Sequence, residues 1–441
     1  MLLKKFFPAL LCSLASVSVA AGESAELDSL KQELSEIKET YELRIEALEA
    51  RIKDLEDAGR APAVAADTAR PAVAAVQEKP SDFNPAIGVV LVGTAADFSP
   101  DNDFAVPGYM VDEEAGPGED GFSVGESELN AKVNIDDRFF GNFTLAVADE
   151  DGSTEVELEE AWFETLALPH GLQLRGGRFF SGIGYRNQFH RHADDFVGRP
   201  LPYRVFMNGQ YIDDGVQVRW LAPTDRYLEF GAEWLRGAGF PAGGADRDGK
   251  GAWSLFGRTG GDVGSSHSWQ AGLSWLSARA SGRESGDGDS FDGDVDLAIL
   301  DAVWKWAPDG NPTRNNLKLE GGLFWQEHDG LFTPGGSGVL AYDADQRGGY
   351  LEGVYQFKPR WRAGLRYAWL DTDDPGAAFS GTSLDTLGVS PKIYSAMLDW
   401  SHSEFSRLRL QYSRDESNID AVDRWYLQYL MSLGAHGAHR F

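Results

Sequence analysis

Histidine and carboxylate side chains lie close together in the segment GYRNQFHRHADDF, residues 184–196. His190 and His192 are separated by one residue, and Asp194 and Asp195 follow directly. Imidazole nitrogens and carboxylate oxygens are donors that Zn²⁺ binds in proteins. We therefore predict that these four residues form a candidate site for a divalent cation. The alternative is that they are ordinary polar residues of a loop or pore.

Two further segments suggest cation chemistry more weakly. His436 and His439 form a second small cluster near the end of the chain. The acidic run DGDSFDGDVD, residues 287–296, is similar to a calcium loop, but Phe291 occupies a position where an EF-hand needs an oxygen ligand. We expect this run to be a solvated acidic surface. Beyond a Zn²⁺ or Ca²⁺ ion, no cofactor is expected.

The sequence contains no recognisable catalytic motif. A serine nucleophile elbow, a phosphate-binding loop and an HExxH pair are all missing from it. The protein is therefore not expected to be an enzyme.

The charge of the chain argues against one class of partner. It carries 69 Asp+Glu against 40 Lys+Arg, a formal net charge of -29, so a polyanion would be repelled and nucleic-acid binding is not expected. After the amino-terminal apolar segment, no stretch reaches the roughly 18 consecutive apolar residues of a transmembrane helix. A membrane β-barrel is compatible with this composition, because its strands alternate between apolar and polar residues.

The amino-terminal region divides into three parts. Residues 1–21 combine a basic start, an apolar core and small residues before a cleavage point, which predicts a signal peptide. The single cysteine, Cys12, lies within it, so the mature chain has no disulfide. Residues 22–58 carry Leu and Ile at alternating three- and four-residue spacing, which predicts a self-associating coiled-coil helix or a helix docked on the main domain. Residues 59–82 are rich in Ala and Pro and predict an extended linker.

Residues 83–441 are predicted to form an all-β transmembrane barrel. Apolar and polar residues alternate in pieces of roughly ten, the length of a tilted membrane strand. We expect about 16 antiparallel strands, the number of pieces we count, with short turns at one end and long loops at the other. The long loops are predicted at residues 100–121, 184–209, 237–251, 281–293, 329–348 and 371–391. A soluble β-sandwich is the alternative, but the second face of these strands carries polar residues that suit water better than a core.

The segment LQYLMSLGAHGAHRF, residues 427–441, has the periodicity of an amphipathic strand and ends in Phe441. We expect it to close the barrel against the first strand, AIGVVLVGTAADF. A terminal aromatic residue on such a strand is similar to the signal that the barrel-assembly machinery of Gram-negative bacteria reads. The outer-membrane lipid and that machinery are therefore expected partners.

Several of these features together resemble the phosphate-selective porin O and P family. The resemblance rests on the heptads of residues 24–57, on GESELNAKVNIDDRFFGNF (125–143), on LQLRGGRFFSGIGYRN (172–187) and on DDGVQVRWLAP (213–223). It implies a 16-stranded outer-membrane barrel that assembles as a homotrimer, with the coiled coil in the periplasm and one loop folded inward to narrow the pore. Related sequences with a segment similar to GYRNQFHRHADDF are labelled zinc-regulated outer-membrane receptors.

Selectivity of such a channel would lie in the inward-folded loop and in the lumen wall. The predicted constriction loop is 184–209, with the pore residues Arg186, His190, Arg191, His192, Asp194, Asp195, Arg199 and Arg204. The predicted basic lumen residues are Arg175, Arg219, Lys318, Arg362, Arg366, Arg407 and Arg409. The predicted acidic ones are Glu126, Glu128, Glu157, Glu159, Glu229, Glu233 and Glu320. Because the lumen is mixed and the long loops are acidic, the preference for anions or cations stays open.

Three functions are compatible with the sequence. The first is a passive channel for small hydrophilic or ionic solutes. The second is a zinc-linked uptake or capture protein that uses His190 and His192. The third is a structural tether, in which the barrel anchors a coiled coil that binds periplasmic or cell-wall components.

Overall fold

The computed structural model describes residues 85–100, 104–112, 115–150, 153–244, 251–285, 288–335 and 338–434. The predicted signal peptide, coiled-coil helix and linker lie outside the described residues, as do His436, His439 and Phe441. No helix among the described residues is long and apolar enough to cross a membrane.

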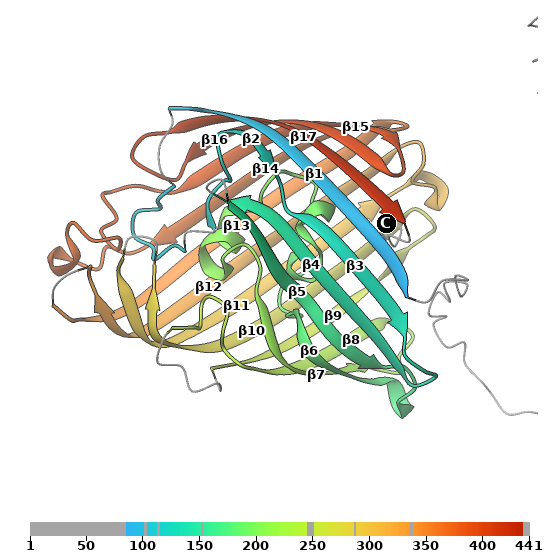
Figure 1. Ribbon diagram of the computed structural model, residues 1–441, viewed down its shortest axis with the longest axis horizontal. Helices are drawn as coiled ribbons and strands as arrows, with labels where there is room; N and C mark the ends of the chain where they lie inside the picture. The colour runs from blue at the N-terminus through green and yellow to red at the C-terminus, as the bar shows by residue number, and fades with distance from the viewer. Residues whose placement is uncertain are drawn as a thin grey trace, which may run out of the picture. The chain divides into compact units, whose positions relative to one another are not determined.

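One antiparallel sheet closes on itself to form the barrel. Strand β1 (Ala86–Ser99) pairs with β17 (Val422–Gly434) over the register from Gly88↔Gly434 to Ser99↔Asp423. The other edge of β1 pairs with two short strands, β2 (Gly121–Val124) and β3 (Ser127–Asn134). These two are halves of one interrupted strand, so the sheet of 17 strands has 16 positions around the barrel, as predicted. Figure 1 shows β1 between β17 and β3.

The remaining elements follow one another around the sheet in chain order. The strands are β4 (Phe139–Glu150), β5 (Ser153–Thr165), β6 (Leu172–Phe180), β7 (Ile212–Leu221), β8 (Tyr227–Leu235), β9 (Ala252–Val263), β10 (His267–Glu284), β11 (Ser290–Trp306), β12 (Asn316–Thr333), β13 (Leu340–Lys358), β14 (Trp361–Thr372), β15 (Lys392–Ser403) and β16 (Ser406–Glu416). The helices are α2 (Leu201–Met207) and the 3-10 turns η2 (Pro169–Gly171), η3 (Arg186–Gln188), η4 (Arg191–Ala193), η5 (Pro308–Gly310) and η6 (Ala377–Phe379).

The outward face of the barrel carries an apolar belt with aromatic residues near its two borders. On β14 and β15, Trp361 packs beside Trp400 near the short turns, with ring centroids 6.2 Å apart. Tyr367 packs beside Tyr394 toward the long loops, with centroids 5.0 Å apart. Leu365 lies between these pairs and is 70% exposed. This arrangement fits lipid contact, because aromatic side chains favour the interface and aliphatic ones the hydrocarbon.

Two of the predicted long loops are wrong. The ladder of β10 and β11 continues to Glu284↔Ser290, and that of β12 and β13 to Phe332↔Leu340, so residues 281–293 and 329–348 are mostly strand. The reason is that the polarity of the strands inverts beyond the belt. There Asp294 lies on the exposed outward face, whereas Phe291 on the inward face is fully buried. Because the prediction relied on apolar residues on the outward face, it placed the ends of these strands too early.

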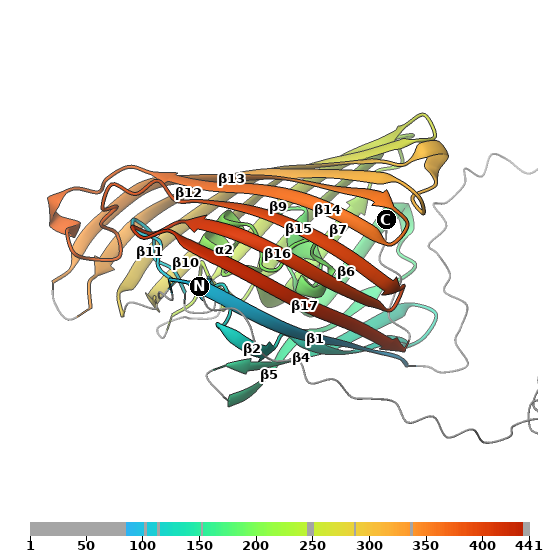
Figure 2. The same ribbon diagram turned by 90° about the horizontal axis from the view of Figure 1, so that it is seen from above.

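The inward face at this end of the barrel carries a hydrophobic cluster together with buried polar residues such as Arg283 and His328. Phe291, Phe332 and Tyr342 pack with Phe379 of η6 in one buried cluster. A second cluster joins side chains of β10 to β14 to α2 and to residues of the loop after β1. In Figure 2, α2 lies within the ring of strands. Loops and strand extensions therefore fill part of the interior with a hydrophobic core.

A charge in the middle of the outward belt tests its assignment to lipid. Leu365→Arg is expected to lower the free energy of unfolding by about 2–4 kcal/mol in lipid vesicles, because the guanidinium would face hydrocarbon. Glu327→Arg serves as the control, because Glu327 is outward and exposed but lies beyond the apolar belt of β12. Urea unfolding of both variants measures the effect. Equal losses of stability would contradict the assignment.

Candidate functional site

The segment between β6 and β7, residues 181–211, enters the barrel and is here called the inner loop. Its two ends are joined by Asn187, whose side-chain nitrogen donates to the carbonyl oxygens of Ser181 at 2.8 Å and Tyr211 at 3.0 Å. The amide of Tyr211 donates back to the Asn187 side-chain oxygen at 2.7 Å. Gly184 has a φ of +66°, and a Cβ there would lie 2.7 Å from the Tyr203 hydroxyl. The loop is therefore a closed, tightly turned unit that a side chain at residue 184 would disturb.

Helix α2 anchors the inner loop to the wall through aromatic packing. The ring of Tyr203 lies 5.0 Å from Phe324 on β12 and 5.8 Å from Tyr350 on β13, both edge to face. Phe206 lies 6.1 Å from Phe324. Asn208 follows the last residue of the helix and adopts the left-handed conformation. Asparagine is common at this position because it tolerates a positive φ. This packing holds one part of the inner loop against the wall.

Arg186 forms the centre of a buried ion network next to α2. Its guanidinium donates to Glu320 on β12 at 2.8 Å and to Asp194 of the loop at 3.0 Å, and it also contacts Glu352 on β13. Arg199 lies 2.7 Å from the other oxygen of Asp194. Charges this deeply buried are stable only when paired. The network therefore ties the inner loop to two wall strands through its side chains.

Asp195 forms a second link between the loop and the wall. Its carboxylate lies 3.1 Å from Lys318 on β12 and 2.7 Å from Arg362 on β14. Arg362 and Arg409 both contact Asp399 on β15, and Arg409 donates to the Asp194 carbonyl at 2.9 Å. Burial alone would raise the pKa of Asp195, but the charges of Lys318 and Arg362 outweigh it and hold that pKa well below its usual value.

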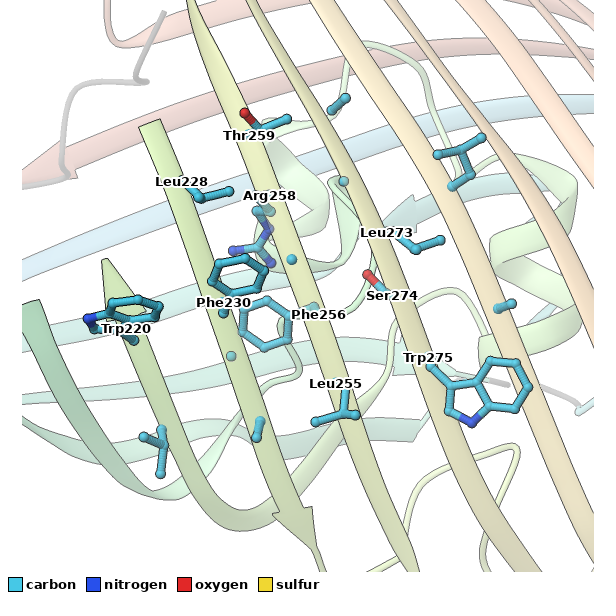
Figure 3. Close-up of a pocket in the computed structure, with 18 residues that line it drawn as sticks. Trp220, Leu228, Phe230, Leu255, Phe256, Arg258, Thr259, Leu273, Ser274 and Trp275 are labelled. Carbon is cyan, nitrogen blue, oxygen red and sulfur yellow. The ribbon is translucent and has the colours of Figure 1, made fainter. Parts of the chain in front are cut away.

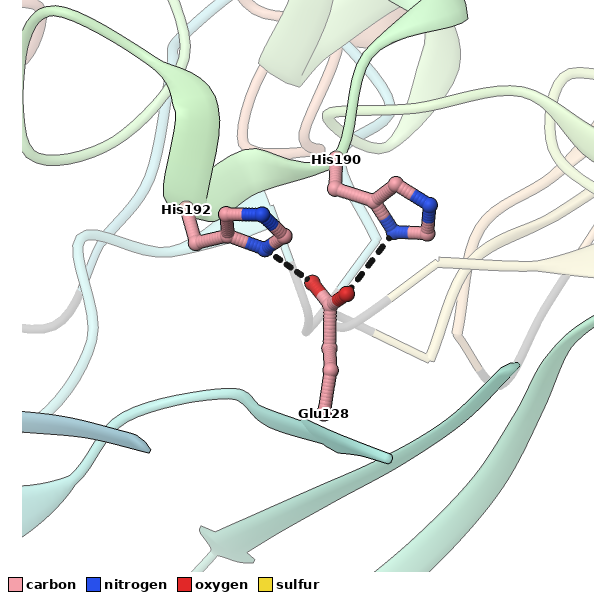
Figure 4. A group of neighbouring side chains, drawn as sticks. All are labelled: Glu128, His190 and His192. Carbon is pink, nitrogen blue, oxygen red and sulfur yellow. Dashed lines mark hydrogen bonds and ion pairs between the residues drawn. The ribbon is translucent and has the colours of Figure 1, made fainter. Parts of the chain in front are cut away.

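His190 and His192 reach the opposite part of the wall (Figure 4). The Nδ1 atom of His190 lies 3.0 Å from Glu128 on β3 and 3.3 Å from Glu159 on β5, and its Nε2 lies 3.1 Å from Glu160. The Nδ1 atom of His192 lies 2.6 Å from the other oxygen of Glu128. The two imidazole rings are stacked, with centroids 5.5 Å apart. Here the loop brings nitrogen donors to a group of wall carboxylates.

Burial disfavours the charged form of the His190 ring. The hydrogen bonds and charges of Glu128, with the hydrogen bonds of Glu159 and Glu160, outweigh this effect and raise the pKa of His190 well above its ordinary value. Without another cation in the cluster, His190 is therefore a proton-carrying partner of the carboxylates.

Strand irregularities create this carboxylate group. Thr144 of β4 pairs with Glu160 and Leu145 pairs with Leu158, so Glu159 is the extra residue of a β-bulge. The bulge lets Glu159 and Glu160 both contact His190, because it breaks the alternation of faces. The sequence prediction assumed that side chains alternate strictly between the two faces of the strand, so it placed Glu159 in the lumen but not Glu160. No sequence signal marks the bulge. Glu126 lies at the interruption between β2 and β3, which is also an irregular point of the ladder.

The structure separates the four residues of the predicted cation site into two groups. Asp194 and Asp195 do not join His190 and His192, because their carboxylates pair with arginine and lysine side chains. Glu128, which sequence analysis placed only in the lumen, instead has ligand atoms within 4.8 Å of those of both histidines. The site therefore consists of one wall carboxylate and two loop imidazoles.

The other predicted pore and lumen residues hold the loops in place or pair along the wall. Arg191 lies 3.3 Å from Glu126, and Arg204 donates to the Ala115 carbonyl at 2.7 Å. Arg366 donates to the Gly198 carbonyl at 2.8 Å, and Arg407 to that of His192 at 2.9 Å. Predicted lumen residues also form the ion pairs Arg175–Glu164, Arg219–Glu164, Arg178–Glu157 and Arg258–Glu229, and Glu233 accepts a hydrogen bond from the Gly182 amide.

A groove of about 820 Å³ lies on β7 to β11, away from the inner loop's histidines (Figure 3). Its rim includes the outward side chains Trp220, Phe230, Leu273 and Trp275. Glycine and alanine residues form much of its floor. Most of the lining is apolar, with Arg258, Thr259 and Ser274 as its hydrophilic members.

Comparisons with known proteins agree with the barrel architecture. No protein-family model matches the chain. An uncharacterized protein of Aquifex aeolicus (strain VF5) is 30% identical over 342 residues, which cover 73% of this chain and 70% of that protein. The anion-selective porin from Comamonas acidovorans has a TM-score of 0.50 at 13% identity, covering 79% of this chain and 98% of its own. Salmonella typhi OmpF, in complex with daunomycin, has a TM-score of 0.50 at 10% identity, covering 79% and 97%. At these identities the two structures establish a porin-like fold.

Removing one charge tests the link between the inner loop and the wall. Asp195→Asn is expected to lower the free energy of unfolding by about 1–3 kcal/mol at pH 7, because Lys318 and Arg362 lose their charged partner. Because the folded pKa of Asp195 is depressed, its contribution is present above about pH 3.9 and is lost as the pH falls toward the folded value. The difference between variant and wild type is therefore expected to shrink only below about pH 4.

Urea unfolding at several pH values measures this difference. Asp309→Asn is the matched control, because Asp309 is exposed in the short turn η5. If both variants were equally destabilised, or if Asp195→Asn matched the wild type at pH 7, the link would not contribute to stability.

Proposed function

Since the chain belongs to the same family as the uncharacterized protein of Aquifex aeolicus, whose name states no activity, we infer its function from the barrel and its interior. We propose an outer-membrane porin that lets small hydrophilic or ionic solutes diffuse passively. The closed sheet, the apolar outward belt and the ionic residues on the inward face support this proposal. The inner loop would act as the constriction, because it contacts β3 and β5 on one part of the wall and β12 to β16 on another.

One observation supports a preference for anions. In several ion pairs near the short turns, the cation is the more exposed partner, whereas in Arg178–Glu157 and Arg258–Glu229 the carboxylate is. Lys318 is 23% exposed against 0% for Glu320, and Arg362 is 25% exposed against 1% for Asp399. Arg219 on β7 shows the same asymmetry. Water next to these three pairs would therefore meet ammonium and guanidinium groups, with the carboxylates behind them.

The position of these cations along their strands supports the same conclusion. Lys318, Arg362 and Arg407 each lie within the first three residues of β12, β14 and β16, near the short turns. A solute passing the inner loop on that side would meet a basic wall. Cations concentrated on a narrow path favour anions by electrostatic attraction. We propose small inorganic or organic anions as the solute class, without a preference for phosphate.

Location and assembly are part of the same proposal. The barrel would lie in a Gram-negative outer membrane, with the residues before β1 on the periplasmic side. The homotrimer that the family resemblance implies stays a prediction, and the groove of β7 to β11 is a candidate subunit contact because it is apolar and recessed. Native mass spectrometry of the detergent-solubilised chain is expected to show three copies. A monomer that persists in lipid vesicles would contradict it.

Single-channel recording in planar bilayers tests the proposed activity and its selectivity. The wild type is expected to conduct, and its zero-current potential in a KCl gradient is expected to have the sign of anion preference. Arg219→Gln should shift that potential toward zero, because it removes a water-facing charge without touching the inner loop. Arg226→Gln, in the exposed turn after β7, should leave it unchanged.

Two outcomes would overturn parts of this proposal. A folded barrel that shows no openings would favour the structural tether over the porin. Cation preference in the wild type would leave the porin intact but refute the role of the exposed cations.

A further inference from the structure

We propose that Glu128, His190 and His192 bind one divalent transition-metal ion of the Zn²⁺ type, and that this ion fastens the inner loop to the barrel wall. The three residues each offer a ligand atom, and these atoms lie within 4.8 Å of one another. Glu128 belongs to β3, whereas both histidines belong to the inner loop. The ion would therefore join two parts of the chain that are more than sixty residues apart.

The donor atoms already face a common point. In Figure 4 the Nδ1 atoms of both imidazoles point to the two carboxylate oxygens of Glu128, at 3.0 Å and 2.6 Å. Ligands at the usual Zn²⁺ bond lengths of roughly 2.0–2.2 Å are themselves about 3.3 Å apart in a tetrahedral site. Small movements of the three side chains would therefore admit the ion in place of the direct hydrogen bonds.

The surroundings of His190 match those of a metal-binding imidazole. Its Nε2 atom lies 3.1 Å from Glu160, which itself accepts hydrogen bonds from Asn142 and Trp162, both at 2.8 Å. An imidazole that donates its second ring hydrogen to a fixed carboxylate presents the other nitrogen as a ligand, an arrangement that recurs around bound zinc. Glu160 would thus be a positioning residue that sets the orientation of the ring.

The charge of the cluster also favours a cation. Glu126, Glu128 and Glu159 have carboxylate oxygens within 4.8 Å of one another. One oxygen of Glu126 is buried and has no hydrogen-bond partner among the described residues. Converging carboxylates repel one another unless positive charge lies between them. Glu159 or Glu126 would be the fourth ligand, and a doubly charged ion would offset the excess negative charge.

The nitrogen donors decide the class of ion. Ca²⁺ and Mg²⁺ prefer oxygen ligands, whereas imidazole suits zinc and its neighbours in the first transition series. The competing occupant is a proton, which would leave His190 as an imidazolium that holds the carboxylates together without a metal. A direct binding measurement separates these two possibilities.

The test uses the full chain in detergent after treatment with a chelator. Titration with Zn²⁺ against a chromogenic chelator is expected to show one tight site per chain in the wild type. Affinity should fall at least tenfold in His192→Ala and in Glu128→Gln, and roughly 10–100-fold in Glu160→Gln. Glu164→Gln is the matched control for Glu160, because Glu164 also lies on β5 but contacts Arg175 and Arg219 instead. It should bind as the wild type does.

Two further controls address the other histidines and the folding of the variants. His170→Ala, in the exposed turn η2, and the double variant His436→Ala/His439→Ala should each keep the tight site. Heat-modifiable migration on gels verifies that each barrel is folded before titration. A wild type without a tight site, or a tight site unaffected in both His192→Ala and Glu128→Gln, would overturn the proposal.

Hydrogen exchange measures whether the ion fastens the loop. Zn²⁺ should slow amide exchange in residues 186–196 of the wild type and leave that of folded His192→Ala unchanged. Tight binding without this protection would refute the role in fastening the loop. Neither measurement depends on conduction, so the metal site and the proposed porin activity can fail separately.

Discussion

The pairing of buried charge is the constraint on which the interior of this protein depends. The inner loop carries arginine, aspartate and histidine side chains into the barrel, where isolated charges would be strongly unfavourable. Three of them are met by wall residues of complementary charge: Arg186 by Glu320 and Glu352, Asp195 by Lys318 and Arg362, and His190 by Glu128 and Glu160. Asp194 and Arg199 instead pair within the loop. A loop of this kind has few alternative positions, because moving it would break several pairs at once.

Two types of interaction hold different parts of the inner loop against the wall. On β12 and β13, aromatic packing of Tyr203 and Phe206 accompanies the Arg186 network. On β3 and β5, the contact is ionic and runs through His190 and His192, with Arg191 paired to Glu126 just before β3. The first contact resembles a protein core, whereas the second would respond to protons and, at the proposed site, to a metal ion. The two parts of the loop therefore differ in what would release them.

The change of polarity along the strands explains how the same barrel can contact lipid on its outer face and pack against loops on its inner face. Within the belt, apolar residues such as Leu365 face outward and charged residues such as Lys318 face inward. Beyond the belt the sense reverses, with Asp294 outside and Phe291 inside. Because a strand presents alternate residues to opposite faces, this reversal needs no change of register. The reversal occurs where the outward face leaves the lipid and the inward face meets packed loops.

Much of the architecture was predictable from sequence, because alternation, turn spacing and strand length are local properties. These properties predicted an antiparallel barrel of about 16 strands and placed Arg175, Arg219 and Arg362 on its inward face. They did not predict that the strands near residues 281–293 and 329–348 continue, because the outward pattern there is polar.

Composition and periodicity alone determined the fold class and the inward parity of most strands, because burial and hydrogen bonding repeat every two residues along a strand. Only the tertiary structure decided which charges meet. Sequence proximity suggested that Asp194 and Asp195 join His190 and His192, but folding turns those aspartates toward arginines and lysine. Glu128 and Glu160 take their place, because a β-bulge and the closure of the barrel bring distant strands to the loop.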